Sequence, residues 1–189
     1  MSQRRPRAEV HERILRAADK LFYFKGIQAV GVDTLAKAAG VSKRTLYKHF
    51  ASKDDLVAAY LARRAAALTA AEGPPLQVVL GAFENLERWF ATQSFRGCPF
   101  VNAVAELGGA PGHPALPISA AYKARRRQWF EDNLRALGVA DPAALAEQMV
   151  ILLEGAIATS LVRGGDPSVA ASAGAAARVL LAGAGVKVD

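Results

Sequence analysis

Only one of the 189 residues is a cysteine, Cys98. A single cysteine excludes an intramolecular disulfide framework and leaves too few thiols for a structural zinc site. We therefore expect a protein of a reducing compartment, without a metal site and without any other cofactor.

The sequence also lacks an uninterrupted apolar run of membrane-spanning length. The longest weakly polar stretch, near Met149 to Val162, contains Glu154, which favours a buried helix over a membrane span. The arginine-rich N-terminus continues into the mixed-charge stretch AEVHERILRAADK, which argues against a secretory signal peptide. We therefore expect a soluble, cytoplasmic protein with no membrane among its partners.

Alternation of apolar and polar residues, the pattern of half-buried strands, is missing as well, and there is no internal repeat. Apolar residues recur at helical spacing instead, so we predict an all-α fold. The predicted helices are one ended by Gly26, Asp33–Ala39, one opening after Ser42, Ser52 to Gly73, Leu76–Gln93, Val101–Leu107, Ile118–Leu137, Pro142–Val162 and Pro167–Ala182. The segment Gly108–Pro117 is predicted as a loop.

Positive charge is concentrated in the first third of the chain. Residues 1–71 contain 14 Lys or Arg and 6 Asp or Glu, a balance of +8, and the whole-chain charge of +7 leaves −1 for the remainder. A positive potential confined to one module is typical of docking on nucleic-acid phosphates. A generally basic soluble protein explains this asymmetry poorly.

Two short predicted helices flank the turn Ala39–Ser42. Gly40 suits a tight turn because it has no side chain, and such a turn sets the angle at which the second helix of a helix-turn-helix enters the major groove. Ser42 can cap that second helix. Its exposed face offers side chains that can contact bases or phosphates, namely Lys43, Arg44, Thr45, Tyr47 and Lys48.

The stretch VDTLAKAAGVSKRTLYKHFASKDDL resembles the DNA-binding signature of the tetracycline-repressor (TetR) family, and ILRAADKLFYFKG resembles the first helix of that family. We accordingly expect an N-terminal three-helix, helix-turn-helix DNA-binding domain in residues 1–50. A larger helical regulatory and dimerisation domain is expected in residues 51–189, with residues 51–71 as the connecting helix.

The same resemblance implies roles for individual residues. Ser42 caps the recognition helix, and Lys53 reaches a backbone phosphate from the start of the connecting helix. Gly31 departs from the family pattern, because many members have Ser or Thr there as the cap of the preceding helix. Glycine caps only slightly less well. The positions where members of the family contact DNA are Lys43, Arg44, Thr45, Tyr47 and His49.

Two features of the N-terminal region allow a second interpretation. His49 is either a DNA contact or a surface histidine without a role. Arg4, Arg5 and Arg7 are either an idle tail or a basic arm that reaches phosphates or the minor groove.

A single helix-turn-helix reads few base pairs, so such modules usually bind palindromic DNA as two-fold dimers. In the TetR family the last two helices pair with those of the partner subunit. We therefore predict a homodimer rather than a monomer in which these helices only complete the core. The predicted dimer residues are Leu152, Ala156, Ile157, Leu161, Ala173, Ala177 and Leu180.

The middle helices contain most of the aromatic residues behind the first domain. The resemblance implies a pocket there, and occupation of this pocket by a small-molecule inducer would change the separation of the two recognition helices. Polar members of the candidate set, such as Asn102, can equally satisfy backbone groups. The predicted ligand-binding residues are Trp89, Phe90, Cys98, Phe100, Asn102, Glu106, Trp129 and Met149.

The segment RGCPFVNAVAEL is similar to one found in a subset of the family, with Gly, Cys and an apolar pair before Asn. Pro99 places Cys98 at the start of a predicted helix and near Arg96, where a thiolate would be favoured. Cys98 is thus either a sensor of oxidants or electrophiles or an inert buried thiol. The lack of a second cysteine favours the inert thiol.

These features together predict a sequence-specific transcription regulator whose partner is double-stranded operator DNA. It would be a homodimeric repressor that a small-molecule, electrophilic or oxidising inducer releases from a palindromic site. A constitutive architectural DNA-binding protein is the alternative. An enzyme is not expected, because Cys98 and the three histidines lie in unlike segments and no glycine-rich phosphate loop follows a strand.

Overall fold

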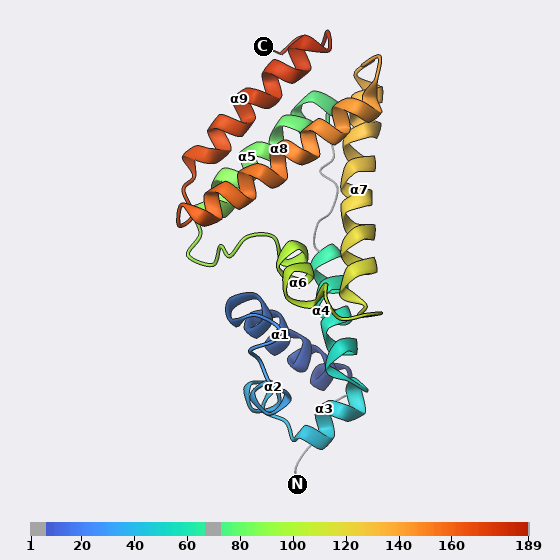
Figure 1. Ribbon diagram of the computed structural model, residues 1–189, viewed down its shortest axis with the longest axis vertical. Helices are drawn as coiled ribbons and strands as arrows, with labels where there is room; N and C mark the ends of the chain where they lie inside the picture. Colours follow the sequence, from blue (N-terminus) through green and yellow to red (C-terminus); the bar gives the residue numbers. More distant parts are fainter. Residues whose placement is uncertain (1–6, 67–72, 189) are drawn as a thin grey trace. The chain divides into compact units, whose positions relative to one another are not determined.

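The computed structural model describes residues 7–66 and 73–188, and the regular structure in these ranges is entirely α-helical (Figure 1). This confirms the predicted all-α fold. The helices are α1 (Arg7–Lys25), α2 (Val32–Ala39), α3 (Lys43–His49), α4 (Lys53–Ala66), α5 (Pro75–Phe90), α6 (Pro99–Leu107), α7 (Ala115–Ala136), α8 (Pro142–Val162) and α9 (Ser168–Gly183).

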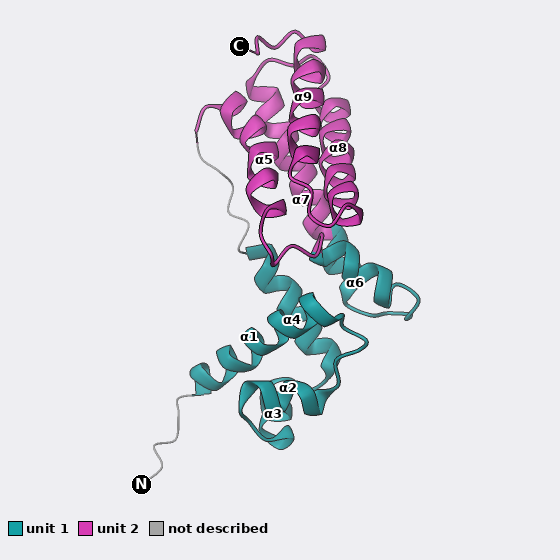
Figure 2. Ribbon diagram, turned by 90° about the vertical axis from the view of Figure 1, so that its left-hand side faces the viewer, with its two compact units in different colours: residues 1–68, 99–120 teal, residues 69–98, 121–189 magenta. Residues whose placement is uncertain are grey.

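Two compact units divide the chain (Figure 2). The first unit comprises residues 1–68 and 99–120, and the second comprises residues 69–98 and 121–189. This division does not coincide with the predicted boundary after residue 50, because α4 packs on α1 and α6 packs on α4. As a separation of DNA binding from regulation, the boundary at residue 50 stays a prediction.

The first unit is built around α1 and α4, which pack through apolar residues at helical spacing. Ile14 of α1 and Leu56 of α4 are fully buried between the helices of this unit. Leu46 of α3 is buried to the same extent, so the short α3 is anchored to the core by its single inward side chain. The rest of α3 is left free to face outward.

Two arginines of α4 bind carboxylates of α1. Arg63 contacts Glu12 at 2.7 Å, and its hydrogen bonds lower the pKa of the Glu12 carboxyl. Arg64 contacts Asp19 at 2.6 Å, and its guanidinium lies 4.4 Å from the centre of the Tyr23 ring. Arg64 donates from two nitrogens to the two Asp19 oxygens, a bidentate geometry that fixes orientation as well as distance, whereas Nη1 of Arg63 alone contacts both Glu12 oxygens. They therefore hold α4 in register with α1.

In the second unit α5, α8 and α9 pack against one another. Phe83 and Phe90 of α5 and Met149 of α8 are buried in this core. Ala177 of α9 is also fully buried, and such small residues let helices approach closely. The turn between α8 and α9 needs Gly165, because a β-carbon there would lie 3.0 Å from the Phe90 carbonyl oxygen and φ is +93°.

α7 begins at Ala115, inside the segment predicted as a loop to Pro117. The Nδ1 atom of His113 accepts a hydrogen bond from the Ala115 N–H at 3.1 Å and so satisfies one free amide of the first turn. Pro117 lies in that same turn, where the N–H that proline lacks has no helical partner. The proline therefore belongs to the start of the helix, and the loop is shorter than predicted.

α8 is the one helix in the described ranges that is long and apolar enough to cross a membrane, by length and composition alone. Only 39% of its most apolar window is buried within the chain. One side packs on α5 and α9, as in the core of a folded protein. The other side exposes Ile151 and Val162, which are 63% and 87% exposed, and an apolar face of this kind usually marks a contact surface.

Candidate nucleic-acid interface

The turn between α2 and α3 depends on a glycine. Gly40 ends α2 with φ 62° and ψ 40°, in the left-handed region that a β-carbon disfavours. Its N–H donates to the Lys37 carbonyl at 3.1 Å, and the N–H of Val41 donates to the Ala36 carbonyl at 3.0 Å. These bonds close the end of α2. The predicted tight turn is therefore present, and it fixes the direction in which α3 departs.

Arg13 of α1 binds the same turn. Its Nε and Nη2 atoms donate to the Ala39 carbonyl at 3.2 and 2.5 Å, and Nη2 also donates to the Gly40 carbonyl at 2.9 Å. Carbonyls at the C-terminal end of a helix lack helical partners and favour a cation. In the sequence pattern Arg13 is only one of several charged residues on the polar side of its helix. Its partners are 26 and 27 residues away along the chain.

We expect Arg13→Ala to lower the free energy of unfolding by about 1–2 kcal/mol, because the end of α2 loses hydrogen bonds from a charged donor. Arg13→Lys keeps the charge but not the forked donor, so its loss should be intermediate. Urea denaturation of the three proteins checks this. Equal unfolding free energies would show that Arg13 does not stabilise the turn.

Ser42 caps α3 as predicted. Its Oγ atom accepts the Thr45 N–H at 3.1 Å and lies 2.8 Å from the Thr45 hydroxyl. Lys43 is paired with Asp33 of α2 at 3.1 Å, and both side chains are largely exposed. An exposed pair of this kind is weak enough to open for another anion.

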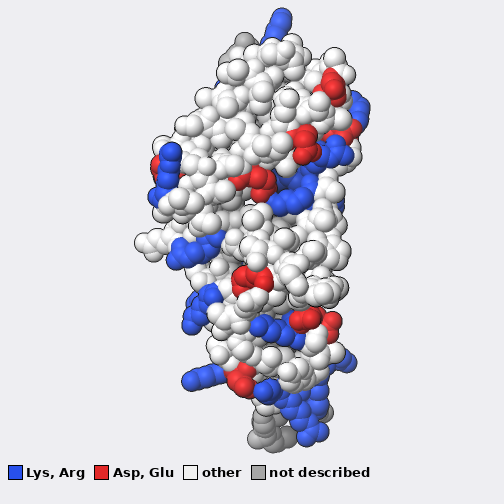
Figure 3. Space-filling view, viewed as in Figure 1, with Lys and Arg blue, Asp and Glu red and all other residues white. Residues whose placement is uncertain are grey.

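The outward face of α3 carries Arg44, Tyr47 and Lys48, and all three are exposed. Within the described ranges none of them makes an ion pair or a side-chain hydrogen bond. Figure 3 shows Lys and Arg side chains gathered at the end of the first unit where α2 and α3 lie. Unpaired cations and a free phenol on one rigid helix form a surface suited to phosphates and base edges.

His49 ends α3 beside a second histidine, with the ring centroids of His11 and His49 5.9 Å apart. Partial burial, and then the nearby charges of His11 and Arg7, lower the pKa of His49. These surroundings disfavour the charged imidazolium in the free protein, and the ring can offer a phosphate a hydrogen bond. Arg4 and Arg5, which belong to the predicted basic arm, lie outside the described residues.

The N-terminal ends of α2 and α4 complete the candidate interface. Gly31 caps α2 in an extended conformation without a side-chain hydrogen bond. α4 begins at Lys53, directly after Ser52, whose hydroxyl accepts the Asp55 N–H at 3.0 Å. The cap holds Lys53 at the positive end of α4, where a lysine and free backbone amides can bind a phosphate together.

The predicted ligand-binding residues belong to both units. α6 of the first unit carries Phe100, Asn102 and Glu106, and the second unit carries Trp89, Phe90, Cys98, Trp129 and Met149. Four of the predicted ligand-binding residues are at most 7% exposed, namely Phe90, Cys98, Phe100 and Met149. Contact of these residues with a ligand stays a prediction.

Cys98 lies beside a lysine–glutamate pair in the second unit. The Nζ atom of Lys123 is 3.3 Å from Sγ of Cys98 and 2.5 Å from a carboxylate oxygen of Glu154. The cation next to the sulfur is thus Lys123, whereas the sequence pointed to Arg96, which donates to the Phe95 carbonyl at 2.7 Å. Cys98 is 7% exposed, and the Lys123 and Glu154 side chains are each 25% exposed.

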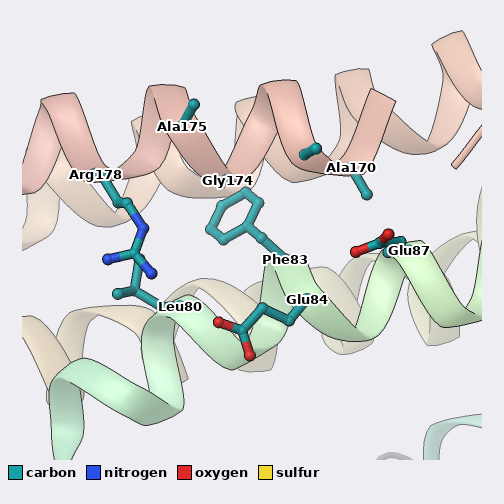
Figure 4. A pocket seen from close by; sticks show the side chains of 9 residues that line it. Leu80, Phe83, Glu84, Glu87, Ala170, Gly174, Ala175 and Arg178 are labelled. Atoms are coloured by element: carbon teal, nitrogen blue, oxygen red, sulfur yellow. The ribbon is translucent and has the colours of Figure 1, made fainter. Parts of the chain in front are cut away.

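A hollow of about 260 Å³ lies between α5 and α9 of the second unit (Figure 4). The Phe83 ring faces Gly174, and the carboxylates of Glu84 and Glu87 come from α5. None of the predicted ligand-binding residues lines this hollow. Pockets for drug-sized ligands measure about 300–1,000 Å³, so the hollow is small for that role. Its lining residues are Leu80, Phe83, Glu84, Glu87, Ala170, Ala171, Gly174, Ala175 and Arg178.

Part of the predicted dimer surface proves to be core. Ala156, Ile157, Ala173 and Ala177 are at most 6% exposed in a single chain, so their side chains pack mainly within their own unit. Contact of these four residues with a partner stays a prediction. The predicted dimer residues with part of their surface open are Leu152, Leu161 and Leu180.

α8 and α9 nevertheless each have an exposed stripe at helical spacing. Apolar residues surround α8 on nearly all sides, so apolar spacing in the sequence could not separate its core side from its open side. On α8 the exposed stripe consists of Ile151, Gly155, Ala158 and Val162, and on α9 it consists of Ser172, Ala175, Val179 and Ala182.

Two family models match the chain. The model "Bacterial regulatory proteins, tetR family" matches residues 14–60, and the model "Tetracyclin repressor-like, C-terminal domain" matches residues 110–183. The first match contains α2, α3 and the turn between them. α6 lies in neither match.

One relative matches most of the chain, and another matches a shorter part of it at higher identity. The transcriptional regulator AcuR of Cereibacter sphaeroides is 32% identical over 163 residues, which are 78% of this chain and 74% of AcuR. The HTH-type transcriptional activator FasR of Mycolicibacterium smegmatis is 47% identical over 60 residues, 32% of this chain but only 27% of FasR.

A solved structure of a TetR regulator has the same fold as this chain. The crystal structure of a putative TetR transcriptional regulator from Streptomyces avermitilis is 34% identical to this chain, with a TM-score of 0.84. The similarity covers 94% of this chain and 99% of that one. The chain therefore belongs to the TetR family of transcriptional regulators, which bind DNA through an N-terminal helix-turn-helix.

Proposed function

We propose that the chain is a cytoplasmic, homodimeric repressor that binds a palindromic operator through α3 and leaves it when an inducer binds. The outward face of α3 carries this proposal, because Arg44, Tyr47 and Lys48 are exposed and unpaired within the described ranges. The helix that presents them is fixed by the Ser42 cap and by the turn at Gly40. Tyr47 and Lys48 would contact phosphates, and Arg44 would read a base.

Selection of bound sequences from random DNA duplexes tests the proposal. We expect the full chain to enrich one palindromic site, because a two-fold dimer presents two identical recognition helices. Salt-sensitive binding without any sequence preference would instead identify a constitutive architectural protein, the alternative function.

The dimer contact would be formed by the exposed stripes of α8 and α9. Val162 and Val179 are 87% and 71% exposed in the single chain, which is unusual for large apolar residues. Gly155 and the alanines between such residues permit close approach of a second pair of helices. The open apolar side of α8 is then covered by the partner subunit.

The inducer would bind to the second unit. An electrophilic inducer would react with Cys98. Lys123 supports this role, since an ammonium group 3.3 Å from the sulfur stabilises negative charge on it during attack on an electrophile. The low exposure of Cys98 supports an inert thiol instead. A thermal-shift screen of small apolar and electrophilic compounds, followed by a test of release from the selected duplex, identifies an inducer of either kind.

If Cys98 is the sensor, we expect Lys123→Met to slow its alkylation by N-ethylmaleimide by about tenfold, because the charge at the sulfur is lost. Glu154→Gln keeps the ammonium group and serves as the matched control, while Cys98→Ser gives the background. The rates are measured on the folded protein. Alkylation of the unmodified protein only after unfolding would establish the inert thiol.

A further inference from the structure

Glu106, near the end of α6, binds the turn that leads from α1 into α2. Its Oε2 atom accepts the Gln28 N–H at 2.8 Å, and the Gln28 side-chain amide donates to the Glu106 carbonyl oxygen. The carboxylate also lies against Gly26, where an added β-carbon would be 3.1 Å from Oε2. The glutamate therefore holds this turn at Gln28, 78 residues away along the chain, and leaves no room for a side chain at Gly26.

His113, in the short segment between α6 and α7, lies against the first turn of α4. Its Nδ1 atom accepts the Ala115 N–H, so the proton of the neutral ring is on Nε2. That Nε2 atom is 3.4 Å from Oδ1 of Asp54, the residue that follows Lys53. The His113 side chain is only 7% exposed, so burial and the Ala115 hydrogen bond hold the ring, and Asp54 lies next to it with a 60% exposed side chain.

We infer that Glu106 and His113 are positioning residues for DNA binding. Glu106 fixes the turn before α2, and His113 fixes the first turn of α4, which carries Lys53. The two contacts thus brace both ends of the surface that would meet the DNA backbone. α6 and the segment after it belong to the first unit, although neither family model covers Glu106.

This inference rests on the proposed docking of α3 and Lys53 on DNA. The second unit takes no part in it, because both contacts and all their partners lie in the first unit. Binding geometry should therefore depend on these residues even without an inducer. A helix end displaced by an ångström can lose a phosphate contact while the fold stays intact.

Two charge-matched pairs of full-length variants test the inference. Glu106→Ala and Glu106→Gln both remove the carboxylate charge, but only Gln keeps an oxygen that accepts the Gln28 N–H. Asp54→Ala and Asp54→Asn also both remove the carboxylate charge, but only Asn keeps an oxygen that can face Nε2 of His113. Each variant is titrated with the palindromic duplex selected by the unmodified chain and with a nonspecific duplex of equal length, at several salt concentrations and at a temperature where it is fully folded.

We expect each alanine variant to bind the selected duplex about three- to tenfold more weakly than its amide counterpart, at equal fraction folded. Asp54→Ala should also have a salt slope lower by about 0.9 than Asp54→Asn on both duplexes, because Lys53 loses one phosphate. Combining Asp54→Ala with Lys53→Ala should then add little to Lys53→Ala alone. Equal affinities and slopes within each pair, even with a lower melting temperature for the alanine variant, would overturn the inference.

The two proposals fail in different ways. If the proposed operator function is wrong, the unmodified chain shows no preference between the two duplexes. If the positioning role is wrong, that preference is present but the alanine and amide variants bind alike. The salt slopes of Asp54→Ala and Asp54→Asn on the nonspecific duplex test the positioning role even without a preferred operator, because Lys53 would contact phosphates of any sequence.

Discussion

Ile151→Glu is expected to convert the proposed dimer into a monomer and to weaken binding to the palindromic duplex by at least about 100-fold. Ile151 lies at the start of the exposed stripe of α8 and is 63% exposed in the single chain. In a two-fold contact each substitution occurs twice, so two unpaired carboxylates would be buried together. The cost exceeds about 3 kcal/mol, which a dimer of moderate affinity cannot offset.

Light scattering gives the mass of the variant, and a titration gives its affinity for the duplex. Ala136→Glu, at an exposed position near the end of α7, adds the same charge away from the stripes and should stay dimeric. If Ile151→Glu remains a dimer with unchanged affinity, the dimer contact lies elsewhere on the chain.

Arg44→Ala is expected to lower operator affinity by about 10- to 100-fold and to relax base preference at one position in each half-site. Arg44 is in the first turn of α3, exposed, and without an ion pair in the described ranges, so no internal partner competes with a guanine. A forked guanidinium binds the two acceptors of a guanine edge in a fixed planar geometry, whereas a lysine ammonium reaches them from a flexible stem and with less directional preference.

Arg44→Lys is therefore the matched control, because it keeps the charge and loses the fork. It should bind nonspecific DNA like the unmodified chain and show a base preference between those of the unmodified chain and Arg44→Ala.

Tyr47→Ala should weaken binding evenly across sequences, since a phenol on a phosphate reads no base. Repeating the selection from random DNA with each variant measures these differences. An unchanged consensus with Arg44→Ala would contradict the docking of α3.

The local features of the N-terminal region were predictable because their signals are local. The Ser42 cap, the turn at Gly40 and the glycine cap at Gly31 each depend on a few neighbouring residues. The bounds of α8 were also predictable, because Pro142 and the residues after Val162 mark its ends.

Contacts between distant segments could not be predicted in the same way. Arg13 and Glu106 bind partners 26 to 78 residues away, and in the sequence each looks like an ordinary polar residue of a helix. The Lys123 contact with Cys98 spans 25 residues and depends on where α7 runs. The burial of Ala156 and Ala177 was not predictable either, because in helices rich in alanine and leucine these residues fit a dimer face as well as a core by composition alone.

In the function proposed above, two chains bind the two half-sites of one palindrome through α3. A titration of the full chain against the selected palindrome, and against the same duplex with one half-site scrambled, tests it most directly. We expect two chains on the palindrome and an affinity about 100-fold or more lower for the scrambled duplex. Equal affinity for the two duplexes would contradict it.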